Sequence, residues 1–293
     1  EKTTLFLLCN PHNPCGRVWT REELQWMYDI CKKYGVKVAS DEIHCELIMP
    51  GYEFVPFGTI TDDCVVMNSP SKNFNTAGLQ IANIICSNPS WRRRIDRAIN
   101  INEVCDVNPF GIVALQAAYN ESEDWLDELN QYLWDNYQAL CAFVAENIPQ
   151  WKVTRLEGTY LVWVDVSYYC DTAAAYDNVE ALCNHLLTEG KVWVNPGTMY
   201  GAESGKGYIR INIACPKSQM MEGLKRIKTI IFKNSNENTS DLIKGAKYEG
   251  DDNNPYHVIT YFVPLENIEF NINKIQICAN IVKEKFDKKF NNE

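Results

Sequence analysis

The chain has 293 residues, of which 46% are hydrophobic and 23% are charged, and its formal net charge at pH 7 is -10. This length and apolar content are sufficient for one large or two medium-sized domains with buried cores. The acidic balance argues against nucleic-acid binding and provides no polybasic membrane signal, and the longest apolar runs are too short to span a bilayer. We therefore expect neither nucleic acid nor a membrane as a partner.

The chain start and the cysteines set further limits. Because Glu1 is not an initiator Met and no signal-peptide pattern follows it, we expect the chain to begin inside a longer protein. The 12 cysteines are scattered without a CxxC pair, and most lie in apolar contexts, as Cys86 and Cys141 do. This favours reduced structural thiols in a cytoplasmic protein over a disulfide or zinc framework, and we expect no metal site.

The first 40 residues have the pattern strand, capped helix, strand. After the apolar run Leu5–Leu8, Thr20–Glu23 is a capping box, and Gly35 suits the C-terminal cap of a helix that ends near Tyr34. Apolar residues recur in it at helical spacing, at Leu24, Met27, Tyr28 and Cys31. The buried strand Val36–Ser40 follows at once, so this βαβ unit predicts a parallel sheet.

Strands and helices continue to about residue 147. We predict strands over Cys64–Met67 and Ile81–Cys86 and helices over Trp91–Asn100, Phe110–Asn120 and Trp125–Asn147. The last of these helices is long and amphipathic, and it suits a connection between two domains.

From Trp151 the pattern changes to that of a compact α+β domain. It predicts a hairpin of Trp151–Arg155 with Tyr160–Val166, a helix over Val179–Thr188, strand-like residues Val192–Val194, the strand Tyr208–Ile213 and a closing helix over Ser218–Phe232.

The composition changes again near Lys233, since residues 234–293 contain 11 Asn and the preceding 233 residues contain 18. Asn234–Asp241 is typical of a linker, and a strand-like segment, His257–Val263, and a basic amphipathic segment, Ile272–Phe290, follow it without a catalytic motif. We therefore predict a large domain over 1–120, a connecting helix over 121–150, a small domain over 151–233, and a linker with an unassigned tail over 234–293.

Each of three predicted strands leads into a turn with a polar residue, namely Asn13, Asp41 and Lys72. Ligands of open parallel sheets bind just beyond the carboxyl ends of the strands. A lysine there can bind pyridoxal phosphate covalently, Asp41 can keep its pyridinium nitrogen protonated, and the Asn13 amide can donate to its ring hydroxyl. Singly, these residues have simpler interpretations: a solvated lysine, a helix cap or metal ligand, and a turn residue.

Two further groups extend this constellation. Ser69 and Ser71 flank Lys72 on its N-terminal side and can provide part of a phosphate site. Arg210 stands inside an apolar strand, where an arginine is costly unless it is paired. Because a guanidinium binds a carboxylate in a bidentate way, Arg210 is a candidate for binding the α-carboxylate of an amino acid.

Four motifs occur in a family order: NPHNPCGR at Asn10–Arg17, DEIH at Asp41–His44, SPSK at Ser69–Lys72 and YIRIN at Tyr208–Asn212. Residues 4–232 resemble the class I/II aminotransferases of PLP-dependent fold type I, and the first two motifs are most similar to the cystathionine β-lyase branch. The resemblance implies an α/β fold with an incomplete, mainly parallel large domain and a smaller α+β C-terminal domain. It also implies a homodimer of the full-length protein.

The resemblance implies a role for each candidate residue. Lys72 becomes the lysine that binds pyridoxal phosphate, Asp41 the partner of the pyridinium nitrogen, and Asn13 the partner of the ring hydroxyl. His44 stands where the family often has a Tyr near that hydroxyl, and it either contacts the cofactor or packs beneath it.

The same resemblance places Ser69 and Ser71 near the phosphate and makes Arg210 the carboxylate clamp. Gln80 stands where many aminotransferases have a phosphate-binding Arg, which favours the lyase branch.

The leading functional hypothesis is C–S β-elimination from cystathionine or a cysteine S-conjugate, which gives a thiol, pyruvate and ammonia, with Lys72 as general base. An aminotransferase acting on amino acids is the alternative enzyme. A third hypothesis is a truncated inactive or regulatory homologue, because some lyases of this branch resemble bacterial regulators. The N-terminal segment of the family, with a phosphate loop and a stacking aromatic residue, has no counterpart here, so we expect little or no activity from residues 1–293 alone.

Overall fold

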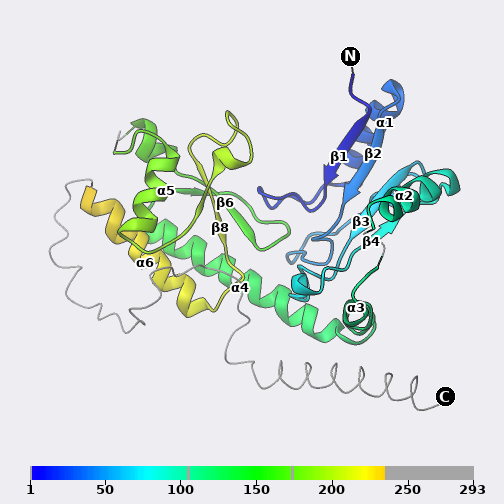
Figure 1. Cartoon of the computed structure of the whole chain (residues 1–293). Coiled ribbons are helices and arrows are strands. Elements are labelled where there is room, and N and C mark those ends of the chain that lie inside the picture. Colours follow the sequence, from blue (N-terminus) through cyan, green and yellow to red (C-terminus); the bar gives the residue numbers. More distant parts are fainter. Residues whose placement is uncertain (1, 104–105, 173–174, 235–293) are drawn as a thin grey trace, which may run out of the picture.

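The computed structural model describes residues 2–103, 106–172 and 175–234, so the elements predicted beyond Asn234 lie outside the described part. The described part of the chain contains two four-stranded sheets (Figure 1). The first sheet has the order β1-β2-β3-β4, with β1 at Leu5–Cys9, β2 at Lys37–Asp41, β3 at Cys64–Asn68 and β4 at Asn83–Ile85. The first three strands are parallel, as predicted, and β4 is antiparallel to β3.

Helix α1, at Arg21–Tyr34, connects β1 to β2, and both of its predicted caps are present. The Thr20 hydroxyl accepts a hydrogen bond from the Glu23 N–H (3.3 Å), and the Glu23 carboxylate accepts one from the Thr20 N–H (2.8 Å). Gly35 ends the helix with a left-handed φ of 68°. The capping box therefore fixes where the chain turns back from the carboxyl end of β1.

Three more helices follow the first sheet: α2 at Pro89–Ile101, α3 at Pro109–Glu121 and α4 at Glu123–Asn147. Figure 1 shows α4 running from α3 toward the second sheet, and its bounds confirm the long helix predicted over Trp125–Asn147. Among the described helices, none is long and apolar enough to cross a membrane.

The second sheet has the order β5-β6-β8-β7 and is antiparallel throughout. Its strands are β5 at Lys152–Val153, β6 at Leu161–Asp165, β7 at Asn195–Pro196 and β8 at Tyr208–Asn212. Strands β5 and β6 confirm the predicted hairpin. Helices α5, at Val179–Thr188, and α6, at Lys217–Asn234, pack with α4 and this sheet.

The prediction of strand structure at Val192–Val194 is wrong. Val192 and Val194 are buried and Trp193 between them is 51% exposed, so their side chains alternate as in a strand. The backbone does not pair there, because the Val192 N–H bonds to the Leu186 carbonyl at the end of α5 (3.0 Å). Pairing with β8 begins three residues later, at Asn195.

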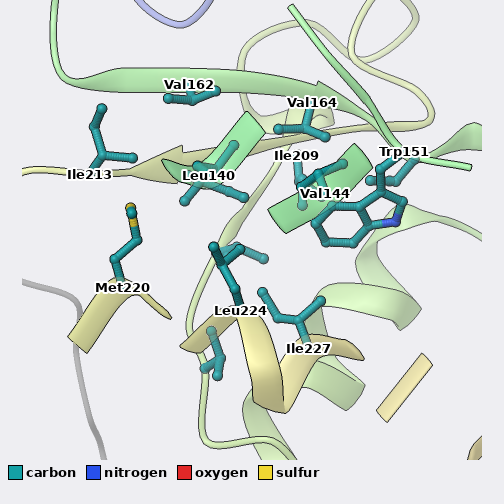
Figure 2. Packing of buried hydrophobic residues seen from close by; sticks show 14 of the residues in the cluster. Leu140, Val144, Trp151, Val162, Val164, Ile209, Ile213, Met220, Leu224 and Ile227 are labelled. Atoms are coloured by element: carbon teal, nitrogen blue, oxygen red, sulfur yellow. The ribbon is translucent and has the colours of Figure 1, made fainter. Parts of the chain in front are cut away.

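The two sheets have separate hydrophobic clusters. The larger cluster lies between the second sheet, α4, α5 and α6, where Leu140, Val162, Ile209 and Leu224 meet in its centre (Figure 2). The smaller cluster lies between the first sheet and α1 and includes Leu24.

Candidate active site

The carboxyl ends of β1, β2 and β3 lie level, because Cys9 is in register with Asp41 and Asp41 with Met67. The chain leaves β1 through Asn10, whose N–H donates to the Asp41 carbonyl (3.0 Å). The turns with Asn13, Asp41 and Lys72 therefore begin at one edge of the sheet, as the sequence predicts.

The turn that carries Lys72 is closed by its own polar groups. The buried Ser69 hydroxyl donates to the Ile81 carbonyl (2.6 Å) and accepts from the Ser71 N–H (3.1 Å). The Phe74 N–H donates to the Pro70 carbonyl (2.9 Å). Ser69 thus holds the turn in shape, and Lys72 is half-buried within it.

His44 is only 3% exposed, and its ring meets Tyr160 edge to face with 5.6 Å between the ring centres. Burial, and then the positive charges of Lys72 and Arg210, lower the pKa of His44 to about 4. The imidazole is therefore neutral at pH 7.

Arg210 joins the second sheet to the first. Its Nη1 donates to Asn13 Oδ1 (2.9 Å), and its guanidinium lies over the Tyr200 ring, 4.8 Å from the ring centre. The Tyr200 hydroxyl accepts from Asn195 Nδ2 on β7 (2.8 Å). Because the Asn13 oxygen accepts from Arg210, the NH2 group is the end of this amide that can donate to a ligand.

Asp41 lies exposed at the end of β2, where its Oδ1 accepts from the Ile43 N–H (3.2 Å). The neighbouring Glu42 is buried, and its carboxylate accepts from the Ser40 hydroxyl (3.0 Å) and the Phe57 N–H (2.8 Å). Burial raises the pKa of Glu42 despite these two bonds. Glu42 therefore stabilises the DEIH turn from the buried side, while Asp41 is exposed to solvent.

Buried polar atoms gather around these residues. His44 Nδ1 and Arg210 Nε are buried, and neither has a hydrogen-bond partner within the described part of the chain. Such atoms are costly unless a ligand or water satisfies them, so they mark a place built for a polar molecule. Among the described residues, no group of three or more His, Cys, Asp or Glu side chains could hold a metal ion.

The structure adds residues that the sequence does not single out. The Tyr200 ring lies under the guanidinium of Arg210, and the Tyr160 ring contacts the imidazole of His44. Asn73, the residue after Lys72, donates a hydrogen bond to the Glu46 carboxylate. Only the position of Asn73 next to Lys72 is a local signal; the other contacts join distant segments.

Turns with a lysine, an aspartate and an asparagine begin at one edge of a mainly parallel sheet, and an arginine from a second sheet binds the asparagine. This arrangement is that of the fold-type I class of PLP-dependent proteins. The sequence profile of the family "Aminotransferase class I and II" matches residues 1–227, and the chain belongs to this family.

Several relatives place the chain within this family. Cystathionine beta-lyase PatB of Bacillus subtilis (strain 168) is 38% identical over 232 residues, which are 78% of this chain and 58% of PatB. Protein MalY of Escherichia coli (strain K12) is 34% identical and is covered over 55% of its length. The chain thus spans little more than half the length of these relatives.

Solved structures show the same architecture. A PLP-bound putative aminotransferase from Clostridium difficile 630 is 40% identical with a TM-score of 0.73, over 78% of this chain and 58% of that one. Cystalysin from Treponema denticola, which contains a pyridoxal 5'-phosphate cofactor, is 33% identical with the same TM-score and the same coverage.

Proposed function

We propose that this chain carries the site of a PLP-dependent C–S β-lyase that acts on cystathionine or cysteine S-conjugates and releases a thiol, pyruvate and ammonia. The observation that carries the proposal is the hydrogen bond from Arg210 of β8 to Asn13 (2.9 Å), at the edge of the parallel sheet where the turns with Asp41 and Lys72 also begin. The similarity to PatB and to a cystathionine beta-lyase of Corynebacterium glutamicum, 34% identical over 237 residues, supports this chemistry.

The residues present fit pyridoxal phosphate as a cofactor. Lys72 would bind it covalently, Asp41 would pair with its ring nitrogen, and Asn13 would donate to its ring hydroxyl through the NH2 group. Ser69 and Ser71 would lie near the phosphate. When bound, pyridoxal phosphate supplies an electron sink for the bonding pair left when the substrate loses its α-proton.

The chain's own residues would orient the substrate and move the proton. Arg210, held by Asn13 and Tyr200, would bind the substrate α-carboxylate. Lys72 would take the α-proton as general base. His44, neutral at pH 7 because of its low pKa, would hydrogen-bond without adding positive charge beside Lys72.

The test supplies the full-length protein with pyridoxal phosphate and cystathionine, because we expect little or no activity from residues 1–293 alone, and measures thiol and pyruvate release. A lyase gives both products, and Lys72→Ala abolishes them, whereas Lys225→Ala, a change at an exposed lysine of α6, leaves them unchanged. Transfer of the amino group to a keto acid without elimination would overturn the proposal.

That second outcome is the alternative function, an aminotransferase. A probable aspartate/prephenate aminotransferase of Aquifex aeolicus (strain VF5), 27% identical over 234 residues, supports it. A third outcome, no activity and no visible absorbance from bound cofactor, would favour the inactive or regulatory homologue.

We further propose a homodimer of the full-length protein and a cytoplasmic location. The exposed side chains of Leu5 and Leu7 on the edge strand β1 support an association, and the ten described cysteines, all free, suit a reducing compartment. We retain 1–120, 121–150 and 151–233 as the limits of the large domain, connecting helix and small domain. Light scattering of the full-length protein tests the dimer, and limited proteolysis tests the limits.

A further inference from the structure

Glu46 lies in the turn after β2 and accepts a hydrogen bond from the residue that follows Lys72. Its carboxylate accepts a hydrogen bond from Asn73 Nδ2, and Asn73 is only 1% exposed. The backbone carbonyl of Glu46 also accepts from Asn130 Nδ2 on α4 (2.8 Å). Glu46 therefore connects the lysine turn to the helix that leads to the second sheet.

The residue after Asn73 is anchored in the same neighbourhood. The ring of Phe74 meets Tyr119 on α3 edge to face, with 5.9 Å between the ring centres and 82° between the planes. Burial raises the pKa of Tyr119, and the charge of Glu46 adds to this effect. Of the two residues that follow Lys72, Asn73 thus bonds to Glu46 itself and Phe74 packs against Tyr119 of α3.

The Glu46 carboxylate itself is half-buried, and burial raises its pKa while the hydrogen bond from Asn73 acts against this. A half-buried carboxylate beside a buried amide is costly to desolvate, and pairing with a donor offsets that cost. The pair is therefore a directed contact between two turns that are 27 residues apart.

We propose that Glu46 is a positioning residue for Lys72. It holds Asn73, and through Asn73 it fixes the backbone of the lysine turn and the direction of the ε-amine. This inference rests on the proposed function in taking Lys72 as the reactive lysine. This role can be separated from the structural role of Glu46 in binding Asn130. That bond uses the backbone carbonyl of Glu46, which remains when the side chain is replaced.

The test measures the initial rate at which an N-hydroxysuccinimide ester acetylates Lys72 in the whole chain, by mass spectrometry, with exposed Lys225 as internal reference. Glu46→Ala removes the acceptor, and Asn73→Asp sets two carboxylates against each other. We expect each to change the Lys72 rate about 2- to 10-fold, as the loss of one hydrogen bond implies.

Two matched variants separate positioning from damage to the fold. The double variant Glu46→Gln with Asn73→Asp restores the hydrogen bond with donor and acceptor exchanged, and its Lys72 rate returns to that of the wild type. Glu53→Ala changes an exposed glutamate of the same loop and leaves the rate unchanged. A Lys72 rate in Glu46→Ala and Asn73→Asp equal to wild type, with Lys225 also unchanged, would overturn the proposal, as would a double variant that is no better than Asn73→Asp.

This measurement needs no cofactor, so the two proposals fail separately. A full-length protein that neither binds pyridoxal phosphate nor releases pyruvate refutes the proposed function, while the acetylation rates still decide the role of Glu46. With cofactor bound, Glu46→Ala also shifts the pH midpoint of the visible band, and the double variant restores it.

Discussion

The two sheets of this chain differ in how they are stabilised. In the second sheet, β6 has four of its five residues buried, and its cluster includes 31 buried residues of the described chain. In the first sheet, β1 buries only Leu8, the cluster includes eight buried residues, and Leu7 is 70% exposed. Hydrophobic burial therefore dominates the second region, whereas polar bonds within turns shape the first, where most of the candidate site lies.

Polar contacts join the two regions, beside the buried side chains of Leu47 and Met49, which belong to the larger hydrophobic cluster. Glu157, 2% exposed and just before β6, accepts from Arg17 Nη1 (2.6 Å) and the Val18 N–H (2.9 Å). The carbonyl of Gly16, which has a left-handed φ of 67°, accepts from the Glu157 and Gly158 N–H groups. These bonds hold the loop of Asn13 against the second region, as Arg210 does from β8. The site thus depends on how the regions meet.

The largest expected difference between the regions is in core truncation. Leu140 of α4 is fully buried, so Leu140→Ala should lower the free energy of unfolding by about 2–5 kcal/mol. Leu5→Ala on β1, where the side chain is 51% exposed, should change it by less than about 0.5 kcal/mol. Urea denaturation followed by circular dichroism measures both. Equal losses at the two positions would contradict the comparison.

The pH dependence of stability should report on the first region. Folding lowers the pKa of His44 from 6.5 to about 4, so the unfolded chain binds more protons between these values. Stability is then complete above pH 6.5, falls as the pH drops toward 4, and loses about 3 kcal/mol from this residue. Urea midpoints from pH 7 to 4 measure the loss, and His44→Gln should remove this part of it. An identical profile for His44→Gln would show that another group is responsible.

A smaller effect is expected where the regions join. Glu157→Ala leaves the buried Val18 N–H without its acceptor and should cost about 1–3 kcal/mol, since the half-buried Arg17 still pairs with Glu23 (2.5 Å). The control is Glu203→Ala, which removes only a solvent-exposed pair with Lys206 and should leave the free energy of unfolding nearly unchanged. Hydrogen exchange should also increase in the loop of Asn13. If hydrogen exchange in Glu157→Ala increased in the second region alone, Glu157 would not stabilise the loop of Asn13.

The sequence predicts those elements whose determinants are local. The capping box at Thr20, the cap at Gly35 and the apolar spacing between them describe α1 completely. Val192–Val194 shows the limit of this reasoning, because alternating burial looks the same whether or not the backbone pairs with a neighbour. A residue such as Val192, bonded back to the preceding helix, therefore imitates a strand.

For the candidate site, the sequence predicts which edge of the sheet is involved but not which side chains pair across it. The need of Arg210 for a partner follows from its apolar strand, yet Asn13, the partner, is 197 residues away. Glu46 and Asn73 belong to turns after different strands, and neither turn alone indicates the other. The predicted roles of all the candidate residues stay predictions, namely those of Asn13, Asp41, His44, Ser69, Ser71, Lys72 and Arg210.

The smallest expected effect concerns the edge of the first sheet. Within the described residues, strand β1 pairs with β2 and is the edge of its sheet, and its sequence from Leu5 to Cys9 contains no charged residue. Such edges associate with other strands, and a lysine on the edge prevents this. Leu7→Lys should therefore leave the free energy of unfolding within about 0.5 kcal/mol, because the side chain is 70% exposed, while it reduces concentration-dependent association in sedimentation velocity. The control is Lys33→Leu, which replaces an exposed lysine of α1 by leucine, away from the sheet edge. It should not reduce association. If Leu7→Lys instead costs several kcal/mol, the first region is held by burial at this edge as the second is by its core, and the comparison between the two regions fails.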